Sequence, residues 1–192
     1  MLSGVGLEGS VMLYRATYAV EFAESLASTI QEGLASKVRR AVAAGDDEHK
    51  ALADDVQTIL REHLKKWGYE DDGLFDWEGN KGRVPGSQQH SYPLLGTSAH
   101  PDAAVLSPFT VAMEFDREPA EKQDWSHFKF CLMKAACHAL SRAYDATLFV
   151  FTLRRKDSKA GTYLDDSESP HTKELLSSLR TRGLVIAIVP AG

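Results

Sequence analysis

Two stretches in the second half of the chain read as buried β-strands with a helix between them. Residues 146–153, ATLFVFTL, and 184–189, LVIAIV, are almost continuously apolar, which is typical of strands covered on both faces. Pro170 opens a helical pattern between them, and Gly183 closes it. Strand, helix and strand in this order predict a right-handed crossover and a parallel pair. We therefore expect an α/β fold with a mixed central sheet flanked by helices on both sides.

Two amphipathic helices are predicted before the sheet. Apolar side chains recur every four residues between residues 11 and 44, and a second apolar stripe predicts a helix over residues 48–67. His63 falls on that second stripe, and we interpret it as a packed histidine rather than a ligand. The segment 68–86 is loop-rich, and a strand is expected within residues 87–95.

The length and composition are those of one globular domain. With 192 residues, 43% of them hydrophobic and 26% charged, the chain is long enough for a sizeable core. We expect an N-terminal helical extension over residues 1–47 and an α/β core over residues 48–192 within that single domain. No run of eighteen apolar residues is present, so no membrane segment is expected.

The two cysteines favour a reducing compartment. Cys131 and Cys137 are six residues apart in one predicted helix, where their side chains point in different directions and are badly placed to form a disulfide. A cytoplasmic location is the expectation that follows.

Three acidic residues flank a predicted hairpin and form the candidate site. The apolar stretches 103–106 and 109–113 predict two strands joined by a turn, with Asp102 before the first strand. Glu114 and Asp116 lie two residues apart at the end of the second strand, so both point to the same face. An antiparallel hairpin would bring Asp102 back towards Glu114. Because like charges repel unless a cation lies between them, the cluster is a candidate site for a hard divalent metal.

The helix after this hairpin contributes a lysine whose role stays open. Residues 125–143 predict a helix, and at 100° per residue Lys129 falls within its apolar face while Lys134 falls opposite and should be solvated. Lys129 either extends past its apolar neighbours to solvent or reaches a buried anion. The nearby carboxylates make the second alternative worth testing.

Basic residues in two loops are candidates for binding nucleic acid. The net charge of −5 argues weakly against such binding, but a local basic surface can coexist with acid concentrated in a metal site. The candidates are Lys81 and Arg83 in the first loop, and Arg154 and Arg155 after the strand 146–153. Ordinary solvated charge is the alternative reading of these residues.

The order of elements, with Pro101-Asp102 opening one strand and Glu114-Phe115-Asp116 closing the next, resembles the PD-(D/E)XK nuclease superfamily, which includes the restriction endonucleases. The resemblance spans residues 48–190. It implies a restriction-endonuclease-like core in which Asp102 and Glu114 bind Mg²⁺, with Mn²⁺ as a substitute. It also implies that the residue two positions after the second acid, usually Lys, positions or activates the attacking water.

This chain departs from that pattern because Asp116 stands where the superfamily usually has Lys. Asp116 itself can serve, Lys129 can supply the ammonium from the following helix, or the site has lost catalysis. The resemblance implies a magnesium-dependent DNA endonuclease, for example of the restriction type, and cutting both strands symmetrically favours a homodimer. The alternative is a catalytically inactive nuclease-like domain that binds nucleic acid or protein within a larger assembly.

Overall fold

The computed structural model describes residues 5–34, 48–68, 75–77, 92–94, 97–106, 109–118, 126–154 and 169–190, together with Ser158 and Leu164. Within these residues the chain forms two sheets and four long helices. No helix in this part of the chain combines the length and the apolar character needed to cross a membrane.

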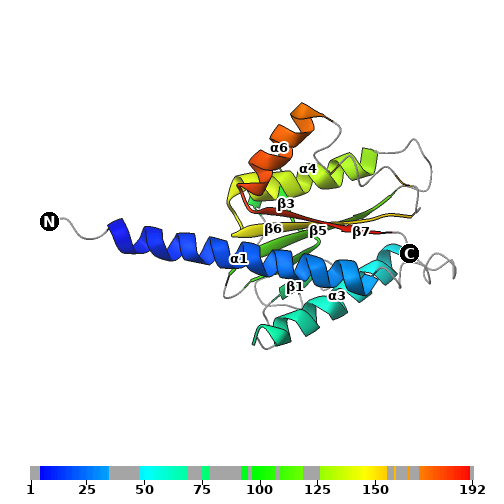
Figure 1. The fold of residues 1–192 in the computed structure, drawn as a ribbon, viewed down its shortest axis with the longest axis horizontal. Coiled ribbons are helices and arrows are strands. Elements are labelled where there is room, and N and C mark those ends of the chain that lie inside the picture. Colours follow the sequence, from blue (N-terminus) through cyan, green and yellow to red (C-terminus); the bar gives the residue numbers. More distant parts are fainter. Residues whose placement is uncertain are drawn as a thin grey trace.

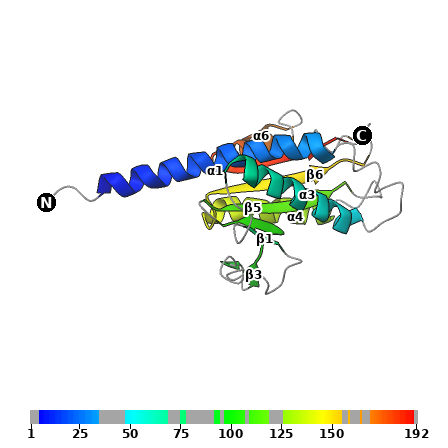
Figure 2. The same ribbon diagram turned by 90° about the horizontal axis from the view of Figure 1, so that it is seen from below.

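The main sheet has five strands, in the spatial order β1-β4-β5-β6-β7. Its strands are β1 (Phe75–Trp77), β4 (Ala103–Val105), β5 (Val111–Arg117), β6 (Ala146–Thr152) and β7 (Leu184–Val189). The β1–β4 and β4–β5 pairs are antiparallel, whereas β5–β6 and β6–β7 are parallel. The strands β2 (Tyr92–Leu94) and β3 (Thr97–Ala99) form a separate antiparallel hairpin that projects from the body of the molecule (Figure 2).

Helices cover both faces of the main sheet. They are α1 (Val5–Leu34), α3 (Glu48–Lys66), α4 (Ser126–Ser141) and α6 (Pro170–Arg180). Figure 1 shows α4 and α6 on one side of the sheet and α1 and α3 on the other. The predicted mixed sheet flanked by helices is therefore confirmed.

Successive side chains along the strands point to opposite faces of the sheet and so contribute to two separate apolar layers. In β6 all seven residues are buried: Leu148 and Val150 pack towards α1 and α3, whereas Phe149 and Phe151 pack towards α4 and α6. A strand whose successive side chains point to opposite faces has to be apolar at every position when both faces are covered. This is why residues 146–152 read as a continuous apolar run.

A cluster of aromatic rings joins α1 and α3 to the hairpin of the main sheet. Phe22 contacts His63, Trp67 and Phe109, and its ring centroid lies 4.9–5.2 Å from theirs. His63 is buried, and its Nδ1 lies 3.3 Å from the hydroxyl of Thr29. The interpretation of His63 as a packed histidine is confirmed. The buried apolar residues of α1 between Ala19 and Leu34 belong to the same core as the sheet.

The element boundaries agree with most of the predictions. The helix expected over residues 48–67, the hairpin formed by β4 and β5, and the parallel pair at the end of the chain are all present. The first helix begins at Val5, earlier than expected, and residues 35–44 of its predicted range lie outside the described part. The strand β1 lies in the segment 68–86 that was expected to be loop-rich with at most a short hairpin around Gly79-Asn80, and it pairs with β4. Of the strand expected within residues 87–95 the structure describes residues 92–94.

Candidate functional site

Asp102 and Glu114 are brought together by the β4–β5 hairpin. Ala103 pairs with Met113 in the antiparallel register, so the residues just outside that pair, Asp102 and Glu114, lie opposite each other. Asp102 is fixed further by a backbone contact, because Phe115 donates its N–H to Asp102 Oδ2 over 2.9 Å. The sequence therefore predicted this convergence correctly from the hairpin alone.

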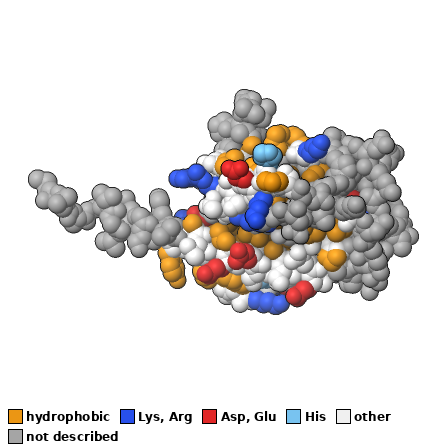
Figure 3. Space-filling model, turned by 45° about the horizontal axis from the view of Figure 1, so that its top comes forward, with side chains coloured by type: hydrophobic (Ala, Val, Ile, Leu, Met, Phe, Trp, Pro, Cys, Tyr) orange, Lys and Arg blue, Asp and Glu red, His pale blue; other side chains and the backbone are white. Residues whose placement is uncertain are grey.

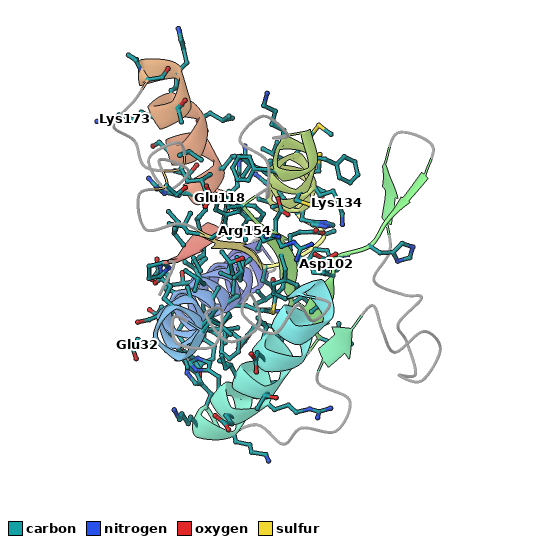
Figure 4. The ribbon with its side chains drawn as sticks, turned by 90° about the vertical axis from the view of Figure 1, so that its right-hand side faces the viewer. Glu32, Asp102, Glu118, Lys134, Arg154 and Lys173 are labelled. Carbon is teal, nitrogen blue, oxygen red and sulfur yellow. The ribbon has the colours of Figure 1, made fainter. Side chains whose placement is uncertain are left out.

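One lysine of α4 reaches both carboxylates. The Nζ of Lys134 lies 2.8 Å from Glu114 Oε2 and 3.6 Å from Asp102 Oδ1. Figure 4 shows the labelled side chains of Lys134 and Asp102 close together at the edge of the sheet below α4. Burial alone would lower the pKa of Lys134, but the charge of Glu114, its hydrogen bond and the charge of Asp102 raise that pKa. Lys134 is therefore an ammonium at neutral pH, held between two acids.

His138, one helical turn after Lys134, holds the other oxygen of Glu114. Its Nε2 lies 2.9 Å from Glu114 Oε1, and both side chains are 0% exposed. Burial, with a further contribution from the charge of Lys134, lowers the pKa of His138 to about 4. The imidazole is therefore neutral at pH 7, and its Nε2–H donates to the ionised carboxylate. Lys134 and His138 together orient Glu114 from one face of α4.

A further acid, Asp116, follows Glu114 along the same strand. Asp116 is buried on the face that packs against α4, where it and Glu114 act on Cys131. Burial and the charges of Asp116, Glu114 and Asp102 raise the pKa of the Cys131 thiol to about 12. Cys131 is therefore a packed thiol and not a nucleophile. The predicted shared face of Glu114 and Asp116 is confirmed.

Glu118 follows directly after β5 and is the next acid along the chain after Asp116. Its carboxylate accepts the backbone N–H of Arg154 over 2.8 Å and the hydroxyl of Ser158 over 2.7 Å. Its own backbone N–H donates to Thr152. Glu118 therefore ties the end of β5 to the chain after β6, and its role is to hold these segments together.

The donor chemistry of the cluster fits a hard divalent cation. Asp102 and Glu114 both lie beside the Lys134 ammonium, and His138, the other neighbour of Glu114, is neutral. Burial and the charge of Glu114 raise the pKa of Asp102, whereas the Lys134 ammonium lowers it, so positive charge near Asp102 stabilises its ionised form. Within the described residues no group of three or more His, Cys, Asp or Glu side chains is arranged around a metal position. Mg²⁺ needs no such cage, because it keeps several waters and often takes one or two carboxylates.

The prediction for Lys129 and Lys134 was wrong and has to be reversed. Lys129 is exposed, whereas Lys134 is half-buried and contacts both acids. The two residues lie five positions apart, about 140° around the helix, so they emerge on opposite edges of its buried face. The lysine that contacts Asp102 and Glu114 therefore lies on the predicted helix, but it is Lys134 and not Lys129.

The candidate nucleic-acid residues are described only in part. Arg154 is half-buried at the end of β6, and its backbone contacts Glu118. Lys81, Arg83 and Arg155 lie outside the described residues. Figure 4 labels Arg154 next to Glu118 and apart from Asp102.

Lys134 and His138 were not predicted as members of the site. A usable signal was present, because Lys134 and His138 are four residues apart and therefore share one edge of the helix. The small residues Cys131, Ala135 and Ala139 also recur every four positions, which permits a close approach of helix to sheet. Neither a family model, nor a curated protein, nor a solved structure matches this chain.

Proposed function

We propose that the protein is a magnesium-dependent DNA endonuclease, with Asp102 and Glu114 as metal ligands and Lys134 as the site ammonium. The observation that carries this proposal is the convergence of two carboxylates on one cation, the Lys134 Nζ, at 2.8 and 3.6 Å. A restriction-endonuclease-like core belongs to the same proposal. It is supported by the succession of α3, three antiparallel strands, α4 and a parallel strand in the main sheet, which agrees with the order behind the sequence resemblance.

The residues of this chain have separate tasks in the proposed reaction. Asp102 and Glu114 would hold Mg²⁺, which supplies positive charge for the phosphate and promotes loss of a proton from the attacking water. His138 keeps the Glu114 carboxylate in one orientation, since its Nε2–H occupies Oε1 and leaves Oε2 towards Lys134. The Lys134 ammonium, whose side chain is 24% exposed, is placed to stabilise negative charge on a phosphate that approaches Asp102.

The test is cleavage of plasmid DNA with Mg²⁺, followed by gel electrophoresis. We expect the wild-type protein to nick or linearise the plasmid, and Asp102→Asn and Glu114→Gln to lose at least 100-fold in rate, within the range that single electrostatic groups contribute. Glu62→Gln, which changes an exposed acid on α3, is the matched control and should retain the wild-type rate. Absence of cleavage by folded protein, or full activity of Asp102→Asn, would overturn the proposal, and cleavage of RNA alone would replace DNA as substrate.

One observation favours a second candidate function, a catalytically inactive nuclease-like module that binds nucleic acid or protein. Glu114 is 0% exposed, and both of its carboxylate oxygens already face protein groups, Lys134 Nζ and His138 Nε2. Such a network can stabilise a domain without any metal. Calorimetric titration with Mn²⁺ separates the two candidates, because the endonuclease requires binding that Asp102→Asn removes, whereas the inactive module predicts none.

A homodimer also belongs to the proposal. An endonuclease that cuts both strands of a duplex at equivalent positions needs two active sites related by a two-fold axis. Sedimentation equilibrium of the protein with and without a short duplex tests this expectation, and a monomer under both conditions would restrict the proposed enzyme to nicking one strand at a time.

A further inference from the structure

The Lys134 ammonium lies against one oxygen of each of two carboxylates. Its Nζ is 2.8 Å from Glu114 Oε2 and 3.6 Å from Asp102 Oδ1. The second oxygen of each acid faces a different group: Asp102 Oδ2 accepts the backbone N–H of Phe115, and Glu114 Oε1 accepts the Nε2–H of His138. The two oxygens best placed to bind a metal ion together are therefore the two that face Lys134.

A divalent ion and this ammonium cannot use the same two oxygens at the same time. Mg²⁺ binds carboxylate oxygens at about 2.0–2.1 Å, whereas an ammonium donates to them at about 2.7–2.9 Å. An ion on Glu114 Oε2 and Asp102 Oδ1 would therefore lie within a few ångströms of the Lys134 Nζ, where the two positive charges repel strongly. Lys134 has to leave its place between the acids for the ion to bind.

The charge of Lys134 dominates the balance of charge at the two acids. His138, the other side chain that contacts Glu114, is neutral at pH 7 because its pKa is lowered to about 4. Figure 3 brings the side of the molecule with α4 and α6 forward, and the basic and acidic side chains drawn there are interspersed rather than gathered in one basic patch. Removal of the Lys134 charge should therefore leave the acid pair with a stronger attraction for an added cation.

Lys134 is also the member of the group that can yield its position. Its side chain is 24% exposed, whereas that of Glu114 is 0% exposed. A lysine carries a strongly hydrated charge on a flexible four-carbon stem, so the ammonium can turn to solvent while the stem stays against the protein. The two acids stay in place, because Phe115 and His138 hold their other oxygens.

We propose that the Lys134 ammonium is a built-in competitor of the divalent cation, which holds the Asp102–Glu114 pair together in the metal-free protein and is displaced when the ion binds. This inference rests on the metal site of the proposed function and adds a form of regulation to it. The affinity for the ion is kept below the value that the two carboxylates alone would give. Lys134, once released, is free to contact the phosphate of the substrate, so the exchange couples metal binding to substrate binding.

Calorimetric titration of the full chain with Mn²⁺ tests the competition. Lys134→Met should bind Mn²⁺ at least about tenfold more tightly than the wild type, because the ion no longer has to break an ion pair with a buried carboxylate. Lys134→Gln is also uncharged and keeps a hydrogen-bond donor for Glu114, so it gives the same comparison if Lys134→Met does not fold. Lys134→Arg keeps the charge and should bind no more tightly than the wild type. Lys129→Met, at an exposed position on the same helix, is the matched control and should leave the affinity unchanged.

Acetylation of lysines gives a second readout that depends on neither affinity nor activity. Saturating Mg²⁺ should raise the rate at which acetic anhydride modifies Lys134 by about threefold or more, since a side chain that is 24% exposed becomes accessible to solvent. Lys129, which is exposed on the same helix, is the internal control and should react at the same rate with and without the ion. Mass spectrometry of proteolytic peptides assigns the modified residue.

The outcomes separate this inference from the proposed function. If the wild type binds Mn²⁺ but the neutral variants of Lys134 bind it no more tightly, or if Mg²⁺ leaves the acetylation of Lys134 unchanged, the inference is overturned while the metal site stands. If only the neutral variants bind Mn²⁺, the competition is supported and the proposed endonuclease is overturned. Absence of binding in every variant overturns both.

Discussion

The ammonium of Lys134 lies 2.8 Å from an oxygen of Glu114, a carboxylate that is 0% exposed. A buried carboxylate is stable only when it keeps compensating charge or hydrogen bonds, and here one lysine and one neutral histidine supply them. The stability of this part of the fold and the chemistry proposed for it therefore depend on the same side chain.

Replacing Lys134 with the uncharged, similarly long methionine should destabilise the protein. Lys134→Met leaves the Glu114 carboxylate buried without its ammonium, and we expect the free energy of unfolding to fall by about 2–3 kcal/mol. The loss should be smaller than for a fully buried ion pair, because the Lys134 side chain is partly exposed. Lys129→Met, on an exposed lysine of the same helix, should change it by less than about 0.5 kcal/mol. Urea denaturation of both variants measures the difference. Equal effects would mean that the ion pair contributes nothing to folding.

The phase of α4 shows where the sequence alone was insufficient. Both faces of this helix carry apolar residues: Phe130, Met133 and Leu140 face outward, while the smaller Cys131 and Ala135 lie against the sheet. Hydrophobicity alone therefore does not distinguish the packed face from the exposed one, and it places Lys129, not Lys134, on the side that faces the sheet. The choice between two apolar faces is made by tertiary packing, which favours small side chains where helix and sheet approach closely.

The strands were predictable because their pattern is local and the hairpin is short. The apolar runs of β6 and β7 require cover on both faces, and the antiparallel turn between β4 and β5 alone places Asp102 beside Glu114. The position of α1 was not predictable in this way. Its contacts with β6 and β7 join residues more than a hundred positions apart, as in the hydrogen bond from Gln31 Nε2 to the carbonyl of Ile188 at 2.9 Å. No local periodicity encodes such a pairing.

Manganese should raise the melting temperature of the wild-type protein. An ion that binds the folded state and not the unfolded chain stabilises it by about 2.7 kcal/mol at one hundred times its dissociation constant. For a chain of this size the corresponding shift is about 5–10 °C. Asp102→Asn, which removes one carboxylate of the site, should abolish the shift, and Glu62→Gln should preserve it. Differential scanning fluorimetry with and without EDTA gives the readout, and a shift that survives in Asp102→Asn would place the ion elsewhere.

Two glycines with the same backbone conformation should respond differently to alanine. Gly68 and Gly183 have φ of 82° and 84°, a region that costs a residue with Cβ about 1–2 kcal/mol. A Cβ at Gly68 would meet nothing within 4 Å, whereas at Gly183 it would lie 3.1 Å from the carbonyl oxygen of Asp145. We therefore expect Gly183→Ala to reduce the free energy of unfolding by about 1 kcal/mol more than Gly68→Ala. Equal losses in urea denaturation would show that backbone strain alone accounts for both.

The buried His63 should make the protein less stable in mild acid. Burial, with a smaller contribution from Lys66, lowers the pKa of His63 in the folded state below its ordinary 6.5, so the unfolded chain binds this proton more readily. The stability contributed by neutral His63 is fully present above pH 6.5. It is lost as the pH falls from 6.5 towards the folded-state pKa, by at most about 1.4 kcal/mol per pH unit.

His63→Phe retains a ring beside Phe22 and Trp67 but cannot be protonated, so its free energy of unfolding should fall less between pH 7.5 and pH 5 than that of the wild type. His138, whose pKa is also lowered, contributes equally to both proteins and cancels in the comparison. His171→Gln, at an exposed position on α6, should keep the wild-type dependence. Urea denaturation at the two pH values measures each slope. If His63→Phe and the wild type lose the same stability, the packing of α3 on α1 is not coupled to the protonation of His63.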